Sequence, residues 1–283
     1  MVSSESRRRA VRVLVARGYP RKKGCRLVGI SPALSRFKRK LRNPVLRDKV
    51  ARLANEHPRY GFRRIHALFV RAGLKVNLKA VHRIWKLEGL RLKRRTIKRR
   101  LGTSTILAPK ATRPNQGWCY DFVHERLENG RAARILVILD EYSRRCLSLM
   151  CAPSIPAVRV AKELEWLFRV HGTPEYIRSD NGTEFVASAV TKQLQESGVK
   201  AKFIEPGSPW QNGRVESFND KLRDELLNRE IFETGSQLQS RLESFKDEHN
   251  NFRPHSSLGY LTPQEWEKKF ASEHNEKEAI LTS

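Results

Sequence analysis

The pattern of apolar residues changes near residue 111, and the pattern beyond that point constrains the fold most strongly. Residues 118–125 and 145–151 alternate between apolar and polar side chains, and residues 134–143 form an almost continuous apolar run. Such patterns are typical of β-strands. An Asn-Gly pair at 129–130 lies between the first two runs and favours a hairpin turn. We therefore expect the sheet to begin with antiparallel strands.

Beyond residue 154 the chain alternates between helical and strand patterns. Apolar residues at helical spacing predict helices at 155–171, 184–197 and 211–229, and short apolar runs predict strands at 174–180 and 199–206. The resulting order is three strands followed by helix, strand, helix, strand and helix. This order indicates an α/β ribonuclease-H-like domain, a mixed five-stranded sheet with flanking helices.

Three acidic residues occupy positions that this fold would bring together. Asp121 lies in the middle of the first strand, Asp180 ends the strand after the first helix, and Glu216 lies in the first turns of the last helix. Side-by-side central strands would place the two aspartates next to each other, with the glutamate reaching across from its helix. Asp140 and Glu141 also follow a strand, so they compete with Asp121 for this role.

Three neighbouring carboxylates repel one another, so the cluster needs cations. Mg²⁺ prefers oxygen ligands, and two such ions about 3.5–4 Å apart can stabilise both the attacking and the leaving oxygen of a phosphoryl displacement. Two Mg²⁺ or Mn²⁺ ions are therefore expected at such a cluster. Single acids also have structural interpretations: Asp180 can cap its turn, and Glu216 can be an exposed residue facing Lys221 or Arg223.

Charge is unevenly distributed along the chain. The first 110 residues contain 33 Lys and Arg against four acidic residues, whereas the remainder carries 23 basic and 26 acidic side chains. A cationic block of this kind indicates a surface that binds DNA phosphates. No apolar run reaches the roughly 18 residues of a membrane span, and the start lacks the pattern of a secretory signal. We expect double-stranded DNA as the partner, no membrane association and a cytoplasmic location.

The beginning of the cationic block predicts a helix-turn-helix. A short helix precedes a Gly-Ile-Ser turn, and Ser31 and Pro32 provide the cap and first position of a second helix. The expected shared core is Leu27, Val28, Ile30, Leu34 and Phe37. The residues expected to face DNA are Ser35, Arg36, Lys38 and Arg39. A plain helical hairpin is the alternative.

A second helical unit follows. Residues 45–57 predict one helix, and two more are expected around the Gly73 turn, the last capped by Asn77 and ended by Gly89. DNA contacts are expected from Arg63, Arg64, Lys79 and Arg83. The densely basic run at 91–100, which includes Arg94 and Arg95, is either a solvated linker or a linker that lies along DNA phosphates.

The tail begins with a helix at Gly235, followed by an irregular arm. His255 lies in that arm, where packing against the catalytic domain is favoured over a direct functional role, and the last dozen polar residues are expected to fray. The expected domains are a helix-turn-helix segment at 1–42, a second helical DNA-binding domain at 43–90, a basic linker at 91–113, the catalytic core at 114–232, and a helix and tail at 233–283.

Several segments together resemble a known family. The matching segments are WCYDFV, LDEYSRRCL, HGTPEYIRSDNGTEF, PWQNGRVESFNDKLRDELL and NFRPHSSLGYLTPQEW, with CRLVGISPALSRF, PRYGFRRIHALF and VNLKAVHRIWKLEGL upstream. In these segments the chain resembles the OrfB transposases of bacterial insertion sequences, which are similar to retroviral integrase. The shared signature is Asp, Asp, a gap of 35 residues, and Glu, and the resemblance extends over about residues 7–270.

The resemblance implies that Asp121, Asp180 and Glu216 are the metal ligands. It also implies that Arg223, seven positions after the glutamate, contacts DNA phosphate near the scissile bond. Lys221 is a further candidate contact, and the loops beside the site would contribute Asn181, Gly182, Gln211, Asn212 and Gly213. Two positions depart from the family pattern: Thr183 replaces a common proline, and Asp220 replaces a common glycine. Asp220 adds a negative charge near Glu216, which leaves a weakened enzyme open.

As an expectation, the resemblance implies binding to terminal inverted repeats, metal-dependent DNA cleavage and strand transfer. It implies a homo-oligomer on DNA in the bacterial nucleoid, with the product of an upstream frame, OrfA, as a partner or fusion. Two other classes stay open. One is a catalytically weak or inactive DNA-binding regulator of transposition, and the other is a ribonuclease-H-type nuclease without strand transfer.

Overall fold

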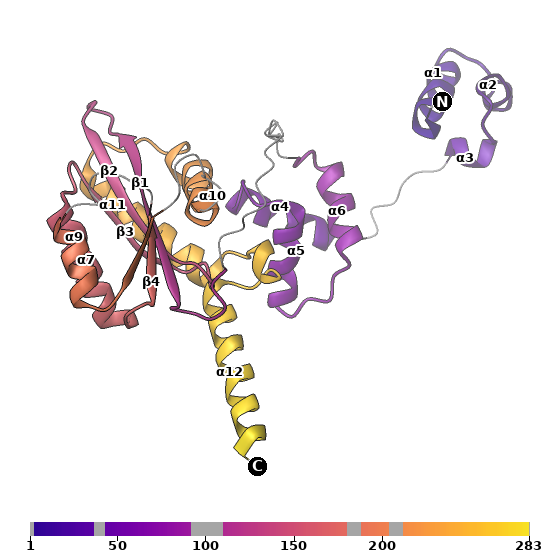
Figure 1. Cartoon of the computed structure of the whole chain (residues 1–283). Coiled ribbons are helices and arrows are strands. Elements are labelled where there is room, and N and C mark those ends of the chain that lie inside the picture. The colour runs from indigo at the N-terminus through magenta and orange to yellow at the C-terminus, as the bar shows by residue number, and fades with distance from the viewer. Residues whose placement is uncertain (1–2, 37–42, 92–109, 180–187, 204–211, 283) are drawn as a thin grey trace. The chain divides into compact units, whose positions relative to one another are not determined.

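The computed structural model describes residues 3–36, 43–91, 110–179, 188–203 and 212–282. The chain divides into two compact units, residues 1–49 and 50–283. Figure 1 draws both units and labels many of their helices and strands. No helix within the described ranges is long and apolar enough to cross a membrane.

The N-terminal unit contains the two helices and the turn that the sequence predicts. Its helices are α1 (Ser4–Ala16), α2 (Arg21–Val28) and α3 (Pro32–Arg36). Gly29 ends α2 in the left-handed conformation with φ of 66°, and the Ser31 hydroxyl accepts a hydrogen bond from the Leu34 backbone N–H at 3.2 Å. The turn and the cap therefore follow from local residue chemistry.

The expected core of this unit is partly wrong. Val11 and Cys25 are buried together with Ile30, whereas Leu27 is 65% exposed and Leu34 is 42% exposed. Leu27 follows Cys25 by two residues, or about 200° around the helix, so it lies on the opposite face of α2. Because α1 packs on the Cys25 face, Leu27 points to solvent. Phe37 lies outside the described residues.

The second group of helices also follows the sequence pattern. Its members are α4 (Pro44–Glu56), α5 (Phe62–Arg71) and α6 (Leu78–Leu87). Gly73 and Gly89 have positive φ, as helix-ending glycines often do. The Asn77 side chain accepts a hydrogen bond from the Lys79 backbone N–H at 2.8 Å and caps α6. These helix starts and stops are confirmed.

The catalytic-type domain is built on the predicted mixed sheet. Its strands are β1 (Gly117–Arg126), β2 (Ala132–Asp140), β3 (Cys146–Ala152), β4 (Tyr176–Ser179) and β5 (Lys200–Phe203). Their order is β3-β2-β1-β4-β5; the β1–β2 and β2–β3 pairs are antiparallel, and the β1–β4 and β4–β5 pairs are parallel. The ribonuclease-H-like arrangement predicted from the order of elements is confirmed.

Helices cover both faces of this sheet (Figure 1). On one face, α7 (Ala157–His171) and α9 (Ser188–Glu196) enclose a core that includes Trp118 and Leu136. On the other face, α10 (Gly213–Leu222) and α11 (Gly235–Asp247) enclose a core that includes Cys119, Val123 and Leu242. Alternation along β1 sends neighbouring side chains to opposite faces.

The C-terminal part is more ordered than the sequence suggests. After α10 and α11 come the π-helical segments η2 (Arg223–Leu227) and η3 (Glu248–Phe252), the 3₁₀ turn η4 (Ser256–Leu258) and α12 (Pro263–Thr282). The expectation of frayed final residues is wrong, because α12 runs through Thr282 and away from the sheet (Figure 1). Its start is a capping box: Thr262 Oγ1 accepts from the Glu265 N–H at 3.1 Å, and the Glu265 carboxylate accepts from the Thr262 N–H at 2.7 Å.

Candidate active site

Asp121 lies on the face of the sheet that α10 covers. It alternates in β1 with Cys119 and Val123, which belong to the core on that face. The Asp121 side chain is half-buried, and its Oδ2 accepts a hydrogen bond from Asn219 Nδ2 at 2.8 Å. Its Oδ1 accepts from the backbone N–H of Phe122 at 2.7 Å. The carboxylate therefore has a defined orientation toward α10.

Glu216 lies in the first turn of α10 and is exposed. Asn219 follows it by three residues, so the two side chains share one face of the helix. Since Asn219 bonds to Asp121, this face of α10 is directed at the middle of β1. Asn219 was missed from the sequence, although its spacing from Glu216 is a readable signal.

Asp180 follows the last residue of β4 in the sequence. β4 pairs in parallel with the start of β1, with Trp118 opposite Ile177 and Cys119 opposite Arg178. The strand thus runs along β1 in the direction of Asp121. Residues 180–187 and 204–211 lie outside the described part of the chain, and so do the predicted site residues Asp180, Asn181, Gly182 and Gln211.

Asp140 has structural partners. It is buried, and its Oδ1 accepts hydrogen bonds from the backbone N–H groups of Tyr142 at 3.0 Å and Ser143 at 2.6 Å, and from the Ser143 hydroxyl at 2.8 Å. Its Oδ2 accepts from the Asn115 N–H at 2.7 Å. Burial raises the pKa of Asp140, and the bonds from Ser143 and Asn115 oppose that shift. Asp140 therefore fixes the turn after β2.

Glu141 is also engaged by structural partners. It is 1% exposed, accepts a hydrogen bond from the Tyr176 hydroxyl at 2.9 Å, and forms an ion pair with Arg178 at 3.3 Å. Both partners belong to β4, so this buried contact ties that strand to the end of β2. These contacts favour Asp121 over Asp140 and Glu141 as the site carboxylate.

Two basic residues follow Glu216 along the same helical stretch. Arg223 donates a hydrogen bond to the His124 carbonyl at 2.9 Å and lies 3.7 Å from the Glu125 carboxylate. Both contacts are on β1, just beyond Asp121. Lys221 donates to the Ser217 carbonyl and hydroxyl, each at 2.9 Å, and burial lowers its pKa to about 8. Arg223 thus contacts the part of β1 that follows Asp121, whereas Lys221 bonds back within its own helix.

The start of α10 holds the remaining predicted loop residues. Asn212 is 5% exposed, and Gly213 is the first residue of the helix and is exposed. A buried Asn212 is positioned to shape the backbone that leads into the Glu216 helix. Its burial argues against the open, DNA-facing position expected from the sequence.

The predicted DNA contacts of the helical segments divide into three groups. Arg36, Arg63, Lys79 and Arg83 are exposed. Ser35 is 9% exposed and its hydroxyl donates to the Pro32 carbonyl at 2.8 Å, so its expected outward orientation is wrong. Arg64 is largely buried beside Glu225 at 3.9 Å. The predicted contacts outside the described residues are Lys38, Arg39, Arg94 and Arg95.

The described donors fit a hard divalent cation. Asp121 and Glu216 supply carboxylate oxygens, the ligand type that Mg²⁺ prefers. Asn219 Oδ1 is buried and has no hydrogen-bond partner among the described residues, so a further oxygen is available at the same place. Within the described ranges, no three His, Cys, Asp or Glu side chains gather into a metal-binding group, and Asp180 lies outside those ranges.

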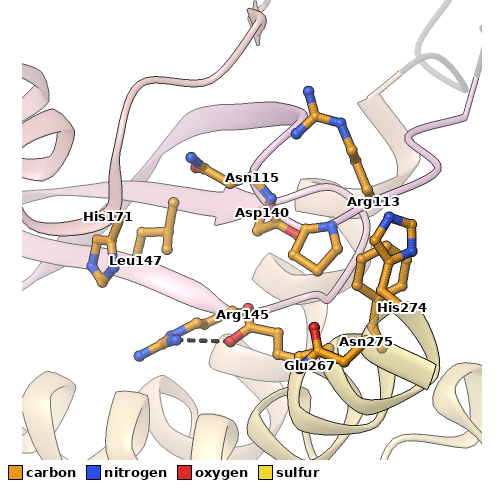
Figure 2. A pocket seen from close by; sticks show the side chains of 12 residues that line it. Arg113, Asn115, Asp140, Arg145, Leu147, His171, Glu267, His274 and Asn275 are labelled. Carbon is orange, nitrogen blue, oxygen red and sulfur yellow. Dashed lines mark hydrogen bonds and ion pairs between the residues drawn. The ribbon is translucent and has the colours of Figure 1, made fainter. Parts of the chain in front are cut away.

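A separate cavity of about 590 Å³ lies near the start of β1, between the sheet and α12. Figure 2 shows Asn115, Asp140 and Leu147 on its sheet side and the ion pair between Arg145 and Glu267, at 2.8 Å. Neither the Asp121 carboxylate nor α10 lines it. This cavity is therefore separate from the candidate carboxylates of β1 and α10.

Known families match both the helical part and the sheet domain of the chain. Residues 111–209 and 197–263 match integrase core domains, and residues 40–98 match an HTH-like domain. The helix-turn-helix-like match thus covers α4 to α6 and the start of the basic linker.

Curated relatives cover most of the chain. A 31.7 kDa protein of insertion element IS407 from Burkholderia multivorans is 35% identical over 89% of this chain and 91% of its own length. A 39.2 kDa protein of IS476 from Xanthomonas euvesicatoria is 32% identical over 89% of this chain and 73% of its own length. The transposase of IS904 from Lactococcus lactis is 27% identical over 82% of this chain and 96% of its own length.

Among solved structures, the HTLV-2 integrase catalytic core domain in complex with magnesium is 16% identical, with a TM-score of 0.43, over 56% of this chain and 99% of that chain. The fold assignment rests on the strand order and directions given above. The integrase core, the HTH-like domain and the insertion-element relatives agree with one another, and they favour transposition over a regulator that only binds DNA. The chain belongs to the OrfB-type transposases of bacterial insertion sequences.

Proposed function

We propose that this transposase cuts DNA at the ends of its insertion sequence and transfers the freed 3′-hydroxyls to target phosphodiesters, with Asp121, Asp180 and Glu216 as metal ligands. The observation that carries the proposal is the hydrogen bond from Asn219 to Asp121. It directs the Glu216 face of α10 at the middle of β1. The parallel β1–β4 register supports a place for Asp180 in the same site.

The proposed cofactor is Mg²⁺ or Mn²⁺, with two ions in each site. When bound, the ions would supply Lewis-acid stabilisation of the attacking and leaving oxygens. The protein residues hold the donors in place: Asn219 orients Asp121, and α10 presents Glu216. Arg223 lies beside β1 with its side chain 43% exposed, where its charge favours contact with a DNA phosphate.

The cationic part of the chain is the proposed end-binding part. We propose helix-turn-helix units at 1–42 and 43–90, a linker at 91–113 that lies along DNA, a core at 114–232 and a tail at 233–283. The HTH-like match at 40–98 supports the second unit. Exposed Arg36, Arg63, Lys79 and Arg83 are suited to phosphate contacts. A homo-oligomer on nucleoid DNA, with the OrfA product as partner or fusion, completes the proposal.

A cleavage assay with controlled metal tests the function. The substrate is a labelled duplex that carries the terminal inverted repeat flanking the gene. We expect nicking at the repeat end with Mg²⁺ or Mn²⁺, and none with EDTA or with Ca²⁺, whose looser coordination geometry suits this chemistry poorly. Equal cleavage in EDTA would contradict a metal-dependent site.

Replacing Asn219 by Ala tests how Asp121 is positioned. The substitution removes the hydrogen bond that orients Asp121 Oδ2, and loss of such a supporting hydrogen bond lowers activity or metal affinity by about 10- to 100-fold. The measurement is the Mg²⁺ concentration that gives half-maximal cleavage, which should rise. Asn251→Ala removes an exposed amide that donates to Asp247, four residues earlier, and it should leave that concentration unchanged. An Asn219→Ala enzyme with wild-type Mg²⁺ dependence would rule out the positioning role.

A further inference from the structure

The segment that joins α4 to α5 contacts an acidic surface formed by Asp224, Glu225 and Glu248, here called the acidic dock. Arg59 donates two hydrogen bonds to the Asp224 carboxylate, one of them from Nε at 2.8 Å. The Tyr60 hydroxyl donates to Glu248 Oε1 at 2.9 Å, and His57 Nδ1 lies 3.3 Å from the same oxygen. Three residues of this segment, His57, Arg59 and Tyr60, therefore contact the acidic dock.

The dock is built from two π-helical segments. Asp224 and Glu225 belong to η2, and Glu248 begins η3. π-Helical turns are rare and occur frequently at functional sites. Here both of them supply the acids that bind residues 57–64. Their common role is the contact with the helical segment.

The centre of the dock is a buried ion pair. Arg253 is 1% exposed and donates to Glu225 from Nε at 2.7 Å and from Nη2. Arg64 of α5 lies 3.9 Å from the same carboxylate, and the Arg64 and Arg253 guanidinium groups lie 5.6 and 5.8 Å from the centre of the Tyr60 ring. Arg253 thus holds the Glu225 carboxylate in a position where Arg64 of α5 also lies close to it.

A second contact extends the interface to the other end of α5. Arg71 donates to the Phe252 carbonyl at 2.6 Å and pairs with Glu265 at 3.1 Å. The basic residues of α5 and its neighbours thus form two sets. Arg59, Arg64 and Arg71 bind the catalytic domain, whereas Arg63, Lys79 and Arg83 are exposed. Each member of the first set is paired with a carboxylate.

We infer that the acidic dock couples the DNA-binding helices to the catalytic helix α10, so that Arg59, Tyr60 and Arg64 act as positioning residues for cleavage. Asp224 follows Glu216 by eight residues along one continuous helical stretch, about 12 Å along its axis. A DNA end bound by exposed Arg63, Lys79 and Arg83 is thereby linked, through the dock, to the helix that carries Glu216. This consequence for cleavage rests on the proposed function; the docking contact itself does not.

A charge exchange in the full-length protein tests the coupling. Asp224→Arg places two like charges together and should raise hydrogen–deuterium exchange in residues 223–227 and 248–252. It should also lower cleavage at the repeat end by about tenfold, while affinity for the end stays within about twofold. Arg59→Asp places a negative charge beside Asp224 and should have the same effects on exchange, cleavage and end binding. The double variant Arg59→Asp/Asp224→Arg restores an opposite pair, so exchange and cleavage should return to within about threefold of wild type.

The matched control is Arg52→Asp, which makes the same charge change on α4 at a side chain that is 73% exposed and pairs along the helix with Glu56. It should change neither exchange in the dock nor cleavage. The inference is overturned if Asp224→Arg leaves exchange at wild-type levels, or if the double variant stays as impaired as the single ones. If the wild-type protein cleaves no DNA, the proposed function fails, but the exchange data still decide whether the dock exists.

Discussion

Asp121→Asn and Glu216→Gln will each lower DNA cleavage by at least about a thousandfold, while binding to the element's ends stays intact. Both substitutions keep the shape of the side chain and remove one negative charge. The expected loss of cleavage therefore comes from weaker binding of the divalent ion rather than from altered packing. Asp121 is half-buried and Glu216 is exposed, so neither variant leaves an uncompensated buried charge. Asp180→Asn is expected to behave in the same way.

The measurement is a cleavage time course with Mg²⁺ beside a gel-shift titration of the same duplex. Asp220→Asn is the matched control, because Asp220 is an exposed acid on α10 one turn beyond Glu216. That variant should cleave within a few-fold of wild type, and any gain would indicate that the extra charge of Asp220 weakens the site. Retained cleavage in Asp121→Asn, Asp180→Asn and Glu216→Gln together would remove the carboxylates from the mechanism.

Arg253→Met will destabilise the catalytic domain by about 3–5 kcal/mol, because it leaves the Glu225 carboxylate without its buried partner. Burial disfavours the charged form of Arg253 and by itself lowers its pKa. The two hydrogen bonds to Glu225 outweigh that effect, so the arginine pKa is raised. The aliphatic part of methionine fills much of the same volume, so the loss reflects the ion pair. The free energy of unfolding in urea, followed by tryptophan fluorescence, measures it.

Arg241→Met provides the comparison. Arg241 also donates two hydrogen bonds to one carboxylate, that of Glu230, at 2.8 and 2.6 Å, but the two side chains are 48% and 35% exposed. A solvent-exposed ion pair contributes only about 0–1 kcal/mol to the free energy of unfolding. If both variants lose the same free energy of unfolding, burial of the Arg253 pair is not what stabilises this region.

Much of the catalytic domain was predictable because its signals are local. The alternation at 118–125 and the Asn-Gly turn determine the β1–β2 hairpin, and β1 pairs with β2 from Trp118 opposite Asp140 to Arg126 opposite Ala132. The same alternation puts Asp121 on the face covered by α10. Helix starts with Asn77 or Ser31 caps were also readable from sequence.

Features that depend on distant partners were not predictable. Asp140 and Glu141 resembled site carboxylates until the structure showed their bonds to Ser143, Asn115, Tyr176 and Arg178. The π-helical segments η2 and η3 have no local signal, since their acids meet residues more than 160 positions away in sequence. Arg64 looked like a DNA contact because its charge alone does not reveal that Glu225 lies beside it.

Two errors had local causes. Ser35 bonds back to the Pro32 carbonyl within a helix of only five residues, so helical spacing was a poor guide to its orientation. The start of α12 carried a readable signal, because Thr262, Pro263 and Glu265 form the pattern of a capping box. The polar composition of the last residues instead favoured a frayed end.

Transfer of a pre-cut DNA end tests the central claim most directly. The protein is given Mg²⁺, a target plasmid and a duplex whose terminal repeat already ends in a 3′-hydroxyl, beside a matched duplex with a 3′-deoxy end. We expect joined product with the hydroxyl end alone, and none from Asp121→Asn or Glu216→Gln. Cleavage of the uncut repeat without any joining of the 3′-hydroxyl end would indicate a nuclease and contradict a strand-transfer enzyme.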